Sequence, residues 1–226
     1  MKIGGLRKLS ALDFPTKICA TVFLTGCNFR CPFCHNATLV TGGGESITEE
    51  EFFSFLKKRT GLLDAVCITG GEPLLYDVTE FIYKIKEMGF LVKLDTNGSF
   101  PEKLSALLNG GLIDYVAMDI KSSVEAYSKL SGGYTDVEKI KKSAALLLGG
   151  KTDFEFRTTV VKGLHTKKDM ESIGKWLSGD EKYFLQTFVP SENTITQGLE
   201  AYTPLELEEL RQVVLPYIPN TNLRGV

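Results

Sequence analysis

This sequence lacks three features, and each absence excludes a class of protein. It lacks an excess of charge, since 26 Lys and Arg nearly balance 28 Asp and Glu. The formal net charge of -2 therefore gives no argument for binding nucleic acid or a membrane surface. It lacks an apolar run near the roughly 20 residues that span a bilayer. Its amino terminus lacks the apolar segment and the small-residue cleavage site of a signal peptide. We expect a cytoplasmic protein.

The sequence also lacks the paired cysteines of a disulfide framework. It has five cysteines, and three of them, Cys27, Cys31 and Cys34, lie within eight positions. In a reducing cytosol, an odd and clustered set indicates metal binding or catalysis. Cys19 and Cys67 each lie in an apolar, strand-like run, so we expect them to be buried small residues.

An alternation of apolar runs and amphipathic segments predicts the fold. The six strand-like runs are residues 18–25, 64–69, 90–96, 114–120, 153–161 and 182–189. The helical segments that follow them begin at Thr48, near Asp77, at Pro101, at Val137, near Lys167 and at Thr203. Apolar strands that return through helices form a parallel sheet with right-handed crossovers.

The number of units limits the architecture. A closed barrel has eight strand–helix units and about 250 residues, whereas this chain has six units in 226 residues. We therefore predict an α/β fold, a partial and open (β/α)6 TIM-like barrel that forms one domain over residues 1–226. A flat, doubly wound sheet is the alternative that the pattern leaves open.

Polar groups follow each predicted strand. Ligands bind at the carboxyl ends of the strands in parallel α/β architectures, so these groups predict an active site. In strand order they are the three clustered cysteines; Gly70, Gly71, Glu72 and Pro73; Asp95, Thr96, Asn97 and Gly98; Asp119 and Lys121; Arg157 and Thr158; and Gln186.

The loop "TGCNFRCPFCHN" is compatible with several chemistries. "CPFCH" fits haem attachment, which normally follows export and would leave Cys27 without a role. "CPFC" fits a redox pair, but no helix pattern begins at Cys31, because residues 36–44 are rich in turn formers. Three thiolates and His35 could bind structural zinc. However, adjacent Cys34 and His35 seldom both reach one tetrahedral ion, and structural zinc usually takes its ligands from two separated pairs.

An iron–sulfur cluster is the fourth possibility. A cubane cluster needs one ligand per iron, and three cysteines leave its fourth iron open, which indicates catalysis. The spacing Cys27-x-x-x-Cys31-x-x-Cys34, with Phe33 before the third cysteine and "GGEP" after the next strand, resembles the radical S-adenosylmethionine (radical SAM) enzymes. The six strand–helix units match the partial barrel of that superfamily.

This resemblance implies a cofactor set and its ligands. Cys27, Cys31 and Cys34 would hold a [4Fe-4S] cluster, and the fourth iron would bind S-adenosylmethionine (SAM). The residues expected around SAM are Phe33 near the adenine, the backbones of Gly70 and Gly71, the carboxylate of Glu72 at the methionine ammonium, and Asp95, Thr96, Asn97, Asp119, Lys121 and Arg157. Asp95 and Asp119 would also frame a monovalent cation, and residues 160–163 would complete the pocket. No catalytic side chain beyond the cluster and cofactor ligands is expected.

The resemblance extends to the reaction. "D-x-P-x-K" at Asp13–Lys17, "GCNFRCPFCHN" and "LQTFVP" resemble the activating proteins of anaerobic ribonucleoside-triphosphate reductase. This implies hydrogen abstraction from a glycine of that glycyl radical enzyme, with electrons from a flavodoxin- or ferredoxin-type donor. No cysteines remain for auxiliary clusters, and only residues 216–226 follow the sixth unit, so we expect the open barrel to admit a protein loop.

Two alternatives stay open, a radical SAM enzyme acting on a small molecule or peptide and a non-enzymatic zinc-binding module. The sequence also departs from pyruvate formate-lyase activating enzymes, because Gln186 or Phe188 stands where they have a histidine. We expect His165 to lie at the surface and His35 to shape the cluster loop by hydrogen bonding.

Overall fold

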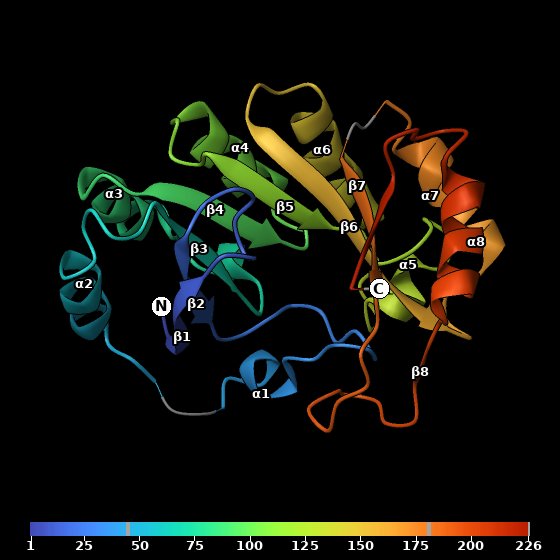
Figure 1. The fold of residues 1–226 in the computed structure, drawn as a ribbon, viewed down its shortest axis with the longest axis horizontal. Helices are drawn as coiled ribbons and strands as arrows, with labels where there is room; N and C mark the ends of the chain where they lie inside the picture. The colour runs from blue at the N-terminus through green and yellow to red at the C-terminus, as the bar shows by residue number, and fades with distance from the viewer. Residues whose placement is uncertain (44–45, 180–181, 226) are drawn as a thin grey trace.

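A curved sheet covered by helices on its outer face dominates the computed structural model, which describes residues 1–43, 46–179 and 182–225 (Figure 1). The strands are β1 (Ile3–Ser10), β2 (Cys19–Leu24), β3 (Ala65–Gly70), β4 (Leu91–Thr96), β5 (Tyr115–Asp119), β6 (Asp153–Lys162), β7 (Tyr183–Thr187), β8 (Glu200–Ala201) and β9 (Asn222–Arg224). The helices are α1 (Ala37–Val40), α2 (Glu49–Lys57), α3 (Thr79–Glu87), α4 (Pro101–Asn109), α5 (Tyr127–Leu130), α6 (Val137–Leu148), α7 (Lys167–Trp176) and α8 (Pro204–Val214), with a 3-10 turn, η1 (Pro73–Leu75).

Strand order confirms the partial barrel. The strands from β2 to β7 lie side by side in chain order and pair in parallel. A doubly wound sheet reverses its strand order at a switch point, and this order does not reverse, so the flat alternative is wrong. In the part of the chain that the structure describes, the sheet ends at β1 on one side and at β9 on the other, and the barrel is open between them.

Three strands were not predicted from the sequence. β1 pairs antiparallel with β2, and β9 pairs in parallel with β7, so these two strands extend the six-stranded sheet at its edges. β8 pairs antiparallel with the end of β6. The predicted turn-rich segment 36–44 contains the short helix α1, and Gly44 lies outside the described residues.

Local sequence signals start three of the helices, α2, α7 and α8, where the sequence predicts. Thr48 caps α2, and its hydroxyl accepts the Glu51 N–H while the Glu51 carboxylate accepts the Thr48 N–H. The same reciprocal capping box begins α7 at Thr166 and α8 at Thr203. The beginnings of these helices are therefore fixed by residues adjacent in sequence.

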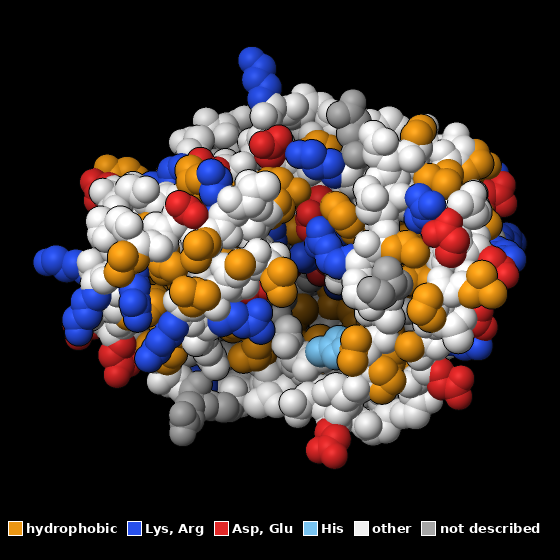
Figure 2. Space-filling model, in the orientation of Figure 1, with side chains coloured by type: hydrophobic (Ala, Val, Ile, Leu, Met, Phe, Trp, Pro, Cys, Tyr) orange, Lys and Arg blue, Asp and Glu red, His pale blue; other side chains and the backbone are white. Residues whose placement is uncertain are grey.

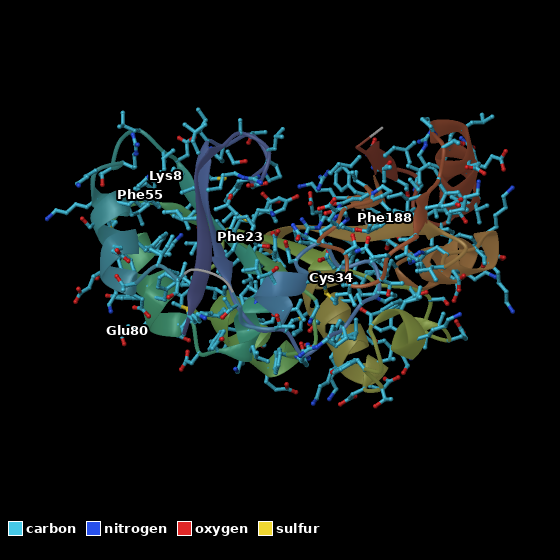
Figure 3. All side chains as sticks on the ribbon, turned by 90° about the horizontal axis from the view of Figure 1, so that it is seen from below. Lys8, Phe23, Cys34, Phe55, Glu80 and Phe188 are labelled. Carbon is cyan, nitrogen blue, oxygen red and sulfur yellow. The ribbon has the colours of Figure 1, made fainter. Side chains whose placement is uncertain are left out.

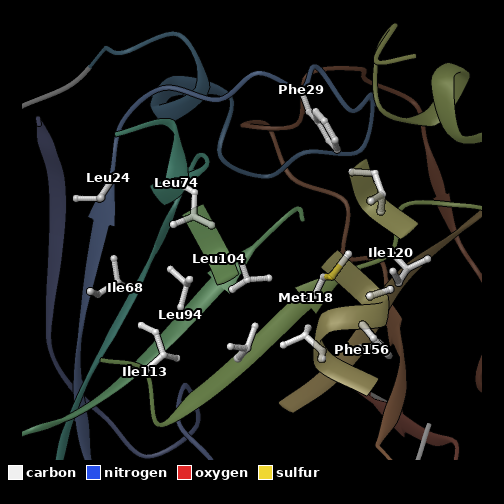
Figure 4. Packing of buried hydrophobic residues seen from close by; sticks show 14 of the residues in the cluster. Leu24, Phe29, Ile68, Leu74, Leu94, Leu104, Ile113, Met118, Ile120 and Phe156 are labelled. Carbon is white, nitrogen blue, oxygen red and sulfur yellow. The ribbon is translucent and has the colours of Figure 1, made fainter. Parts of the chain in front are cut away.

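The two faces of the sheet differ in chemistry. Leu94, Met118 and Phe156 point outward and pack with helix residues such as Leu104 in the main core (Figure 4). Residues alternate between the faces along a strand, so the inner face carries polar groups such as Lys93. The barrel interior can therefore hold charged groups without interrupting the outer core.

An apolar plug closes the amino-terminal end of the barrel. Phe14, from the β1–β2 loop, packs with Cys19, Ala65, Cys67 and Tyr115. Both cysteines are fully buried, as predicted. No helix among the described residues is long and apolar enough to cross a membrane.

Candidate active site

A cavity of about 240 Å³ opens at the carboxyl end of the barrel. It is lined by groups from the ends of β3 to β7 and by the cysteine loop that follows β2. Figure 2 shows a hollow near the middle of the face, with basic side chains inside it and a histidine at its edge. The cavity therefore lies where the sequence predicts the active site.

The three clustered cysteines line this cavity together. A single zinc ion needs its ligands to converge on one point, whereas a cubane cluster takes each thiolate on a separate iron. The Cys27 sulfur also accepts the Phe29 N–H at 3.3 Å, the kind of contact that tunes a cluster. The donor set therefore fits a cubane cluster.

Burial controls the protonation of these thiols. It raises the pKa of Cys27 to about 11 and the pKa of Cys31 to about 12, because a thiolate loses its hydration. The nearby ammonium of Lys121 lowers the pKa of both thiols, but its effect is smaller. Both thiols are protonated near neutral pH in the free protein, and they lose their protons when they bind a metal centre.

Two glycines let the strand ends approach one another. Gly70 has a φ of +119°, and a Cβ there would clash with the backbone of Leu24. A Cβ on Gly71 would overlap the Gly26 carbonyl oxygen. The Gly71 N–H donates to the Leu24 carbonyl at 2.9 Å, and the Glu72 N–H donates to the Gly26 carbonyl at 2.9 Å. The "GGE" segment thus holds the start of the cysteine loop.

Glu72 has a different environment from the one that the resemblance implies. It is 0% exposed and is not among the residues that line the cavity. Its carboxylate accepts the Leu74 N–H at 3.0 Å, the Thr96 hydroxyl at 2.9 Å and the Asn97 N–H at 2.7 Å. Burial raises its pKa to about 7 although these hydrogen bonds lower it. Glu72 therefore holds the end of β4, and its contact with an ammonium group stays a prediction.

The end of β4 is also connected to the cysteine loop. The Asn97 side-chain amide donates to the Asn28 side-chain carbonyl at 3.0 Å, and Asn28 donates to the Ser99 hydroxyl at 2.9 Å. Asn28 directly follows Cys27 in the sequence. These contacts fix Cys27, the first predicted cluster ligand, relative to the predicted SAM-binding residues Thr96 and Asn97.

Charged side chains form a connected network on the cavity wall. The Arg157 Nε donates to Asp119 Oδ1 at 3.0 Å, and its Nη2 lies 3.3 Å from Asp95 Oδ2. Lys121 donates to Asp119 Oδ2 at 3.1 Å. Burial alone would raise the pKa of Asp119, but Arg157 and Lys121 lower it to about 2. Arg157 and Lys93 likewise lower the pKa of Asp95 against the effect of burial, so both acids are ionised over the physiological pH range.

His165 is buried, so the prediction that it lies at the surface is wrong. Its ring is 0% exposed. The Nδ1 atom accepts the Val161 N–H at 3.1 Å, which leaves Nε2 to donate to the Lys121 carbonyl at 2.9 Å. Its ring centroid lies 5.6 Å from that of Phe33. Because both ring nitrogens have backbone partners, burial is tolerated, and His165 links the cysteine loop to the end of β5.

His35 contacts an aromatic ring from a distant part of the chain. It is exposed, and its ring centroid lies 5.2 Å from that of Phe188. Figure 3 shows Cys34 and Phe188, which come from the cysteine loop and from the segment after β7. This segment donates two backbone hydrogen bonds to the loop, from Ile195 to Cys34 at 3.3 Å and from Thr196 to Pro32 at 2.8 Å. Among the described residues the His35 ring has this ring contact and no hydrogen bond, so the predicted hydrogen bonding is not found.

Most of the predicted site residues do lie together. The predicted residues that line the cavity are Cys27, Phe33, Cys31, Cys34, Gly70, Gly71, Asp95, Thr96, Asn97, Asp119, Lys121, Arg157 and Gln186. Residues 160–163 do not line it: Val160 and Val161 are fully buried, and Lys162 forms an ion pair with Glu206. The sequence did not indicate Asn36, Thr69 or Thr159, which also line the cavity.

Comparison with known proteins identifies a family and relatives of this chain. The family described as "Radical SAM superfamily" matches residues 21–177. A protein of Methanocaldococcus jannaschii named "Putative glycyl-radical enzyme activating enzyme" is 34% identical over 99% of this chain and 96% of its own length. A 7-carboxy-7-deazaguanine synthase of Methanospirillum hungatei is 26% identical over 66% of this chain and 62% of its own length.

A solved structure has the same fold. The crystal structure of Streptococcus suis SuiB bound to the precursor peptide SuiA superimposes with a TM-score of 0.69 at 15% sequence identity. The match covers 91% of this chain and 48% of that chain. The family match and the full-length relative together show that the chain belongs to the radical SAM superfamily and is an enzyme whose cofactors are a [4Fe-4S] cluster and SAM.

Proposed function

We propose that this radical SAM enzyme generates a glycyl radical on a partner protein, and that the partner is an anaerobic ribonucleoside-triphosphate reductase. The observation that carries the proposal is the similarity over 99% of the chain to the M. jannaschii protein whose name assigns it to the glycyl-radical activating enzymes. The resemblance of "GCNFRCPFCHN" and of Asp13–Lys17 to reductase-activating proteins supports the choice of partner.

The residues of the cavity have separate tasks in this proposal. Cys27, Cys31 and Cys34 hold the cluster, and Lys121 offers an ammonium to the carboxylate of SAM. When bound, the cluster and SAM supply one-electron cleavage of the sulfonium group and the radical that takes the glycine hydrogen atom. The electron comes from a reduced flavodoxin- or ferredoxin-type donor.

The shape of the cavity supports a protein substrate. The barrel is open between β1 and β9 in the described part of the chain, and the cavity at the carboxyl ends of β3 to β7 is a hollow open to the surface (Figure 2). A small-molecule site usually buries most of the surface of its ligand, whereas an extended loop of a partner can enter an open cavity from one side. A glycine in such a loop has no side chain to prevent close approach to the cavity wall.

A small-molecule substrate is the second candidate. The similarity to a 7-carboxy-7-deazaguanine synthase over 66% of the chain favours it. Such an enzyme would consume SAM and turn over a free substrate without any glycyl radical partner. The two candidates therefore differ in whether a stable protein radical accumulates.

The experiment separates these candidates. The protein is reconstituted anaerobically with iron and sulfide, reduced with dithionite, and given SAM and the candidate reductase. We expect 5′-deoxyadenosine and a glycyl radical signal by electron paramagnetic resonance (EPR). The Cys31→Ala variant should give neither, and Cys19→Ala should give both. Deoxyadenosine without a glycyl signal, at any ratio of the two proteins, would contradict the activase and leave the small-molecule candidate.

A further inference from the structure

Lys93 is a buried charged residue inside the barrel that the proposed reaction does not use. It lies in β4, two residues before Asp95 and on the same inward face of the strand. Lys93 is only 2% exposed. The ammonium donates to Asp95 Oδ1, and its nitrogen lies 3.9 Å from the Cys67 sulfur. A buried ammonium needs a counter-ion, and Asp95, which lines the cofactor cavity, provides it.

All four carboxylate oxygens of Asp95 and Asp119 are paired with cations of the chain itself. Asp95 Oδ1 accepts from Lys93, and Asp95 Oδ2 lies 3.3 Å from Arg157. Asp119 Oδ1 accepts from Arg157 at 3.0 Å, and Asp119 Oδ2 accepts from Lys121 at 3.1 Å. Arg157 Nη1 also lies 4.0 Å from Glu155 Oε1, and Glu155 pairs with Arg224 at 2.8 Å. The connected network therefore has four positive and three negative groups, with a formal charge of +1.

This arrangement does not fit the monovalent cation that the resemblance implies. A hard cation needs several free oxygen ligands around one point. Here the carboxylate oxygens already face ammonium or guanidinium groups, and the Thr96 hydroxyl donates to Glu72 and accepts the Gly98 N–H.

We propose that Lys93 is a positioning residue for the SAM site, and that its buried ammonium, together with Arg157, replaces a monovalent cation between Asp95 and Asp119. Two carboxylates on neighbouring strands repel each other unless positive charge lies between or beside them. Lys93 pairs with Asp95 Oδ1, and Arg157 contacts both Asp95 Oδ2 and Asp119 Oδ1. The inference rests on the family assignment and does not depend on the glycyl radical partner.

The test measures SAM affinity rather than turnover. Anaerobic calorimetric titration of SAM into the reconstituted protein is carried out in KCl, NaCl and choline chloride at equal ionic strength. We expect the wild-type dissociation constant to agree within about twofold in the three salts, because the chain supplies its own cations. A tenfold or greater weakening in choline would overturn the proposal.

Variants of Lys93 should create the cation requirement that the wild type lacks. Lys93→Met should bind SAM about tenfold more weakly in choline chloride, because Asp95 loses the ammonium that neutralises it. K⁺ or Na⁺ should restore part of the affinity. Lys93→Gln keeps a donor for Asp95 without the charge, and it should behave like Lys93→Met.

The matched control is Lys86→Met. Lys86 also pairs with a carboxylate, donating to Asp114 at 2.7 and 2.8 Å, but it lies outside the cavity. Its removal should not change SAM affinity in any salt.

Two results for the Lys93 variants would overturn the proposal. Wild-type SAM affinity of both variants in choline chloride, or weakened affinity that K⁺ and Na⁺ do not improve, would show that Lys93 does not replace a cation. If the Lys93 variants fail to fold, the titrations of the wild-type protein in the three salts still test whether SAM binding needs a monovalent cation.

Discussion

The two ends of the barrel are made by the same strands, but they have opposite chemistry. At the amino-terminal end, Phe14 and Tyr115 seal the interior around Cys19 and Cys67. At the carboxyl end, the interior is polar and opens to a cavity. Since strands β2 to β5 contribute to both ends, the position along the strand decides whether an inward side chain is structural or functional.

The cysteines make this comparison sharpest. Cys31 and Cys67 are both buried, and burial raises the pKa of both thiols. Burial and pKa therefore do not separate the predicted cluster ligand Cys31 from the packing residue Cys67. What separates them is that Cys31 lines the cavity beside two further thiols, whereas Cys67 lies in the plug.

The largest expected effect comes from exchanging one cysteine at each end. Cys31→Ala should lose the cluster and reduce 5′-deoxyadenosine formation to background, because an iron loses its ligand. Cys67→Ala should keep full iron content and lose only about 1 kcal/mol of folding free energy through the smaller side chain. Iron and sulfide analysis with chemical denaturation checks both. Equal iron loss in the two variants would remove the distinction between the ends.

Phe14→Ala tests the sealed end. Removing a buried ring leaves a cavity, so the free energy of unfolding should fall by about 3 kcal/mol. Because Phe14 lies in the plug, iron content per folded chain should not change. Urea denaturation of the reconstituted protein, with iron counted in the folded fraction, measures both. A folded variant that binds no iron would show that the plug also shapes the site.

Glu72→Gln tests the open end through pH. The folded pKa of about 7 lies above the ordinary value of 4.5, so the folded state binds the proton more tightly. Stability from this group is therefore complete at low pH and is lost as pH rises from 4.5 through 7, by up to about 3 kcal/mol. The variant should lack this component. We expect the difference in unfolding free energy between wild type and variant to slope over pH 4.5–7.5, and a flat difference would contradict the assignment.

His35→Ala should have the smallest effect. His35 is exposed and contacts Phe188 through its ring alone, so its removal should change folding free energy by about 0.5 kcal/mol or less. Iron content should stay near that of the wild type. An iron loss comparable to that of Cys31→Ala would show that His35 is a metal ligand. The site would then have four protein ligands, three thiolates and one imidazole, as a structural zinc site does.

Much of the architecture was readable from local pattern. Strands β2 to β7 are apolar runs that alternate with amphipathic helical segments, and three of these helices begin with capping boxes, so the type and order of the elements followed from periodicity. β1 was not predictable, since "IGGLRKLS" contains two glycines and two basic residues and becomes a strand only by pairing with β2. β9 has three residues and depends in the same way on β7.

Site residues were predictable where their position at the end of a strand was enough to place them in the cavity. They were not predictable where contacts with residues distant in sequence determine the burial of the side chain. The carboxyl-end rule located the cysteines and Asp95 because it needs only strand boundaries. It could not show that Glu72 is buried against the end of β4, or that His165 is buried with two backbone partners. Lys93 did leave a signal, since a lysine within the apolar run "FLVKLDT" stands at an inward position two residues before Asp95.

The central claim is that the open end of the barrel holds a cubane cluster with one iron free for SAM. EPR of the reduced, reconstituted protein, recorded with and without SAM, tests it most directly. We predict one [4Fe-4S] cluster per chain and a spectrum that changes when SAM is added. A colourless protein that retains zinc, or a cluster whose spectrum is the same with and without SAM, would contradict the account.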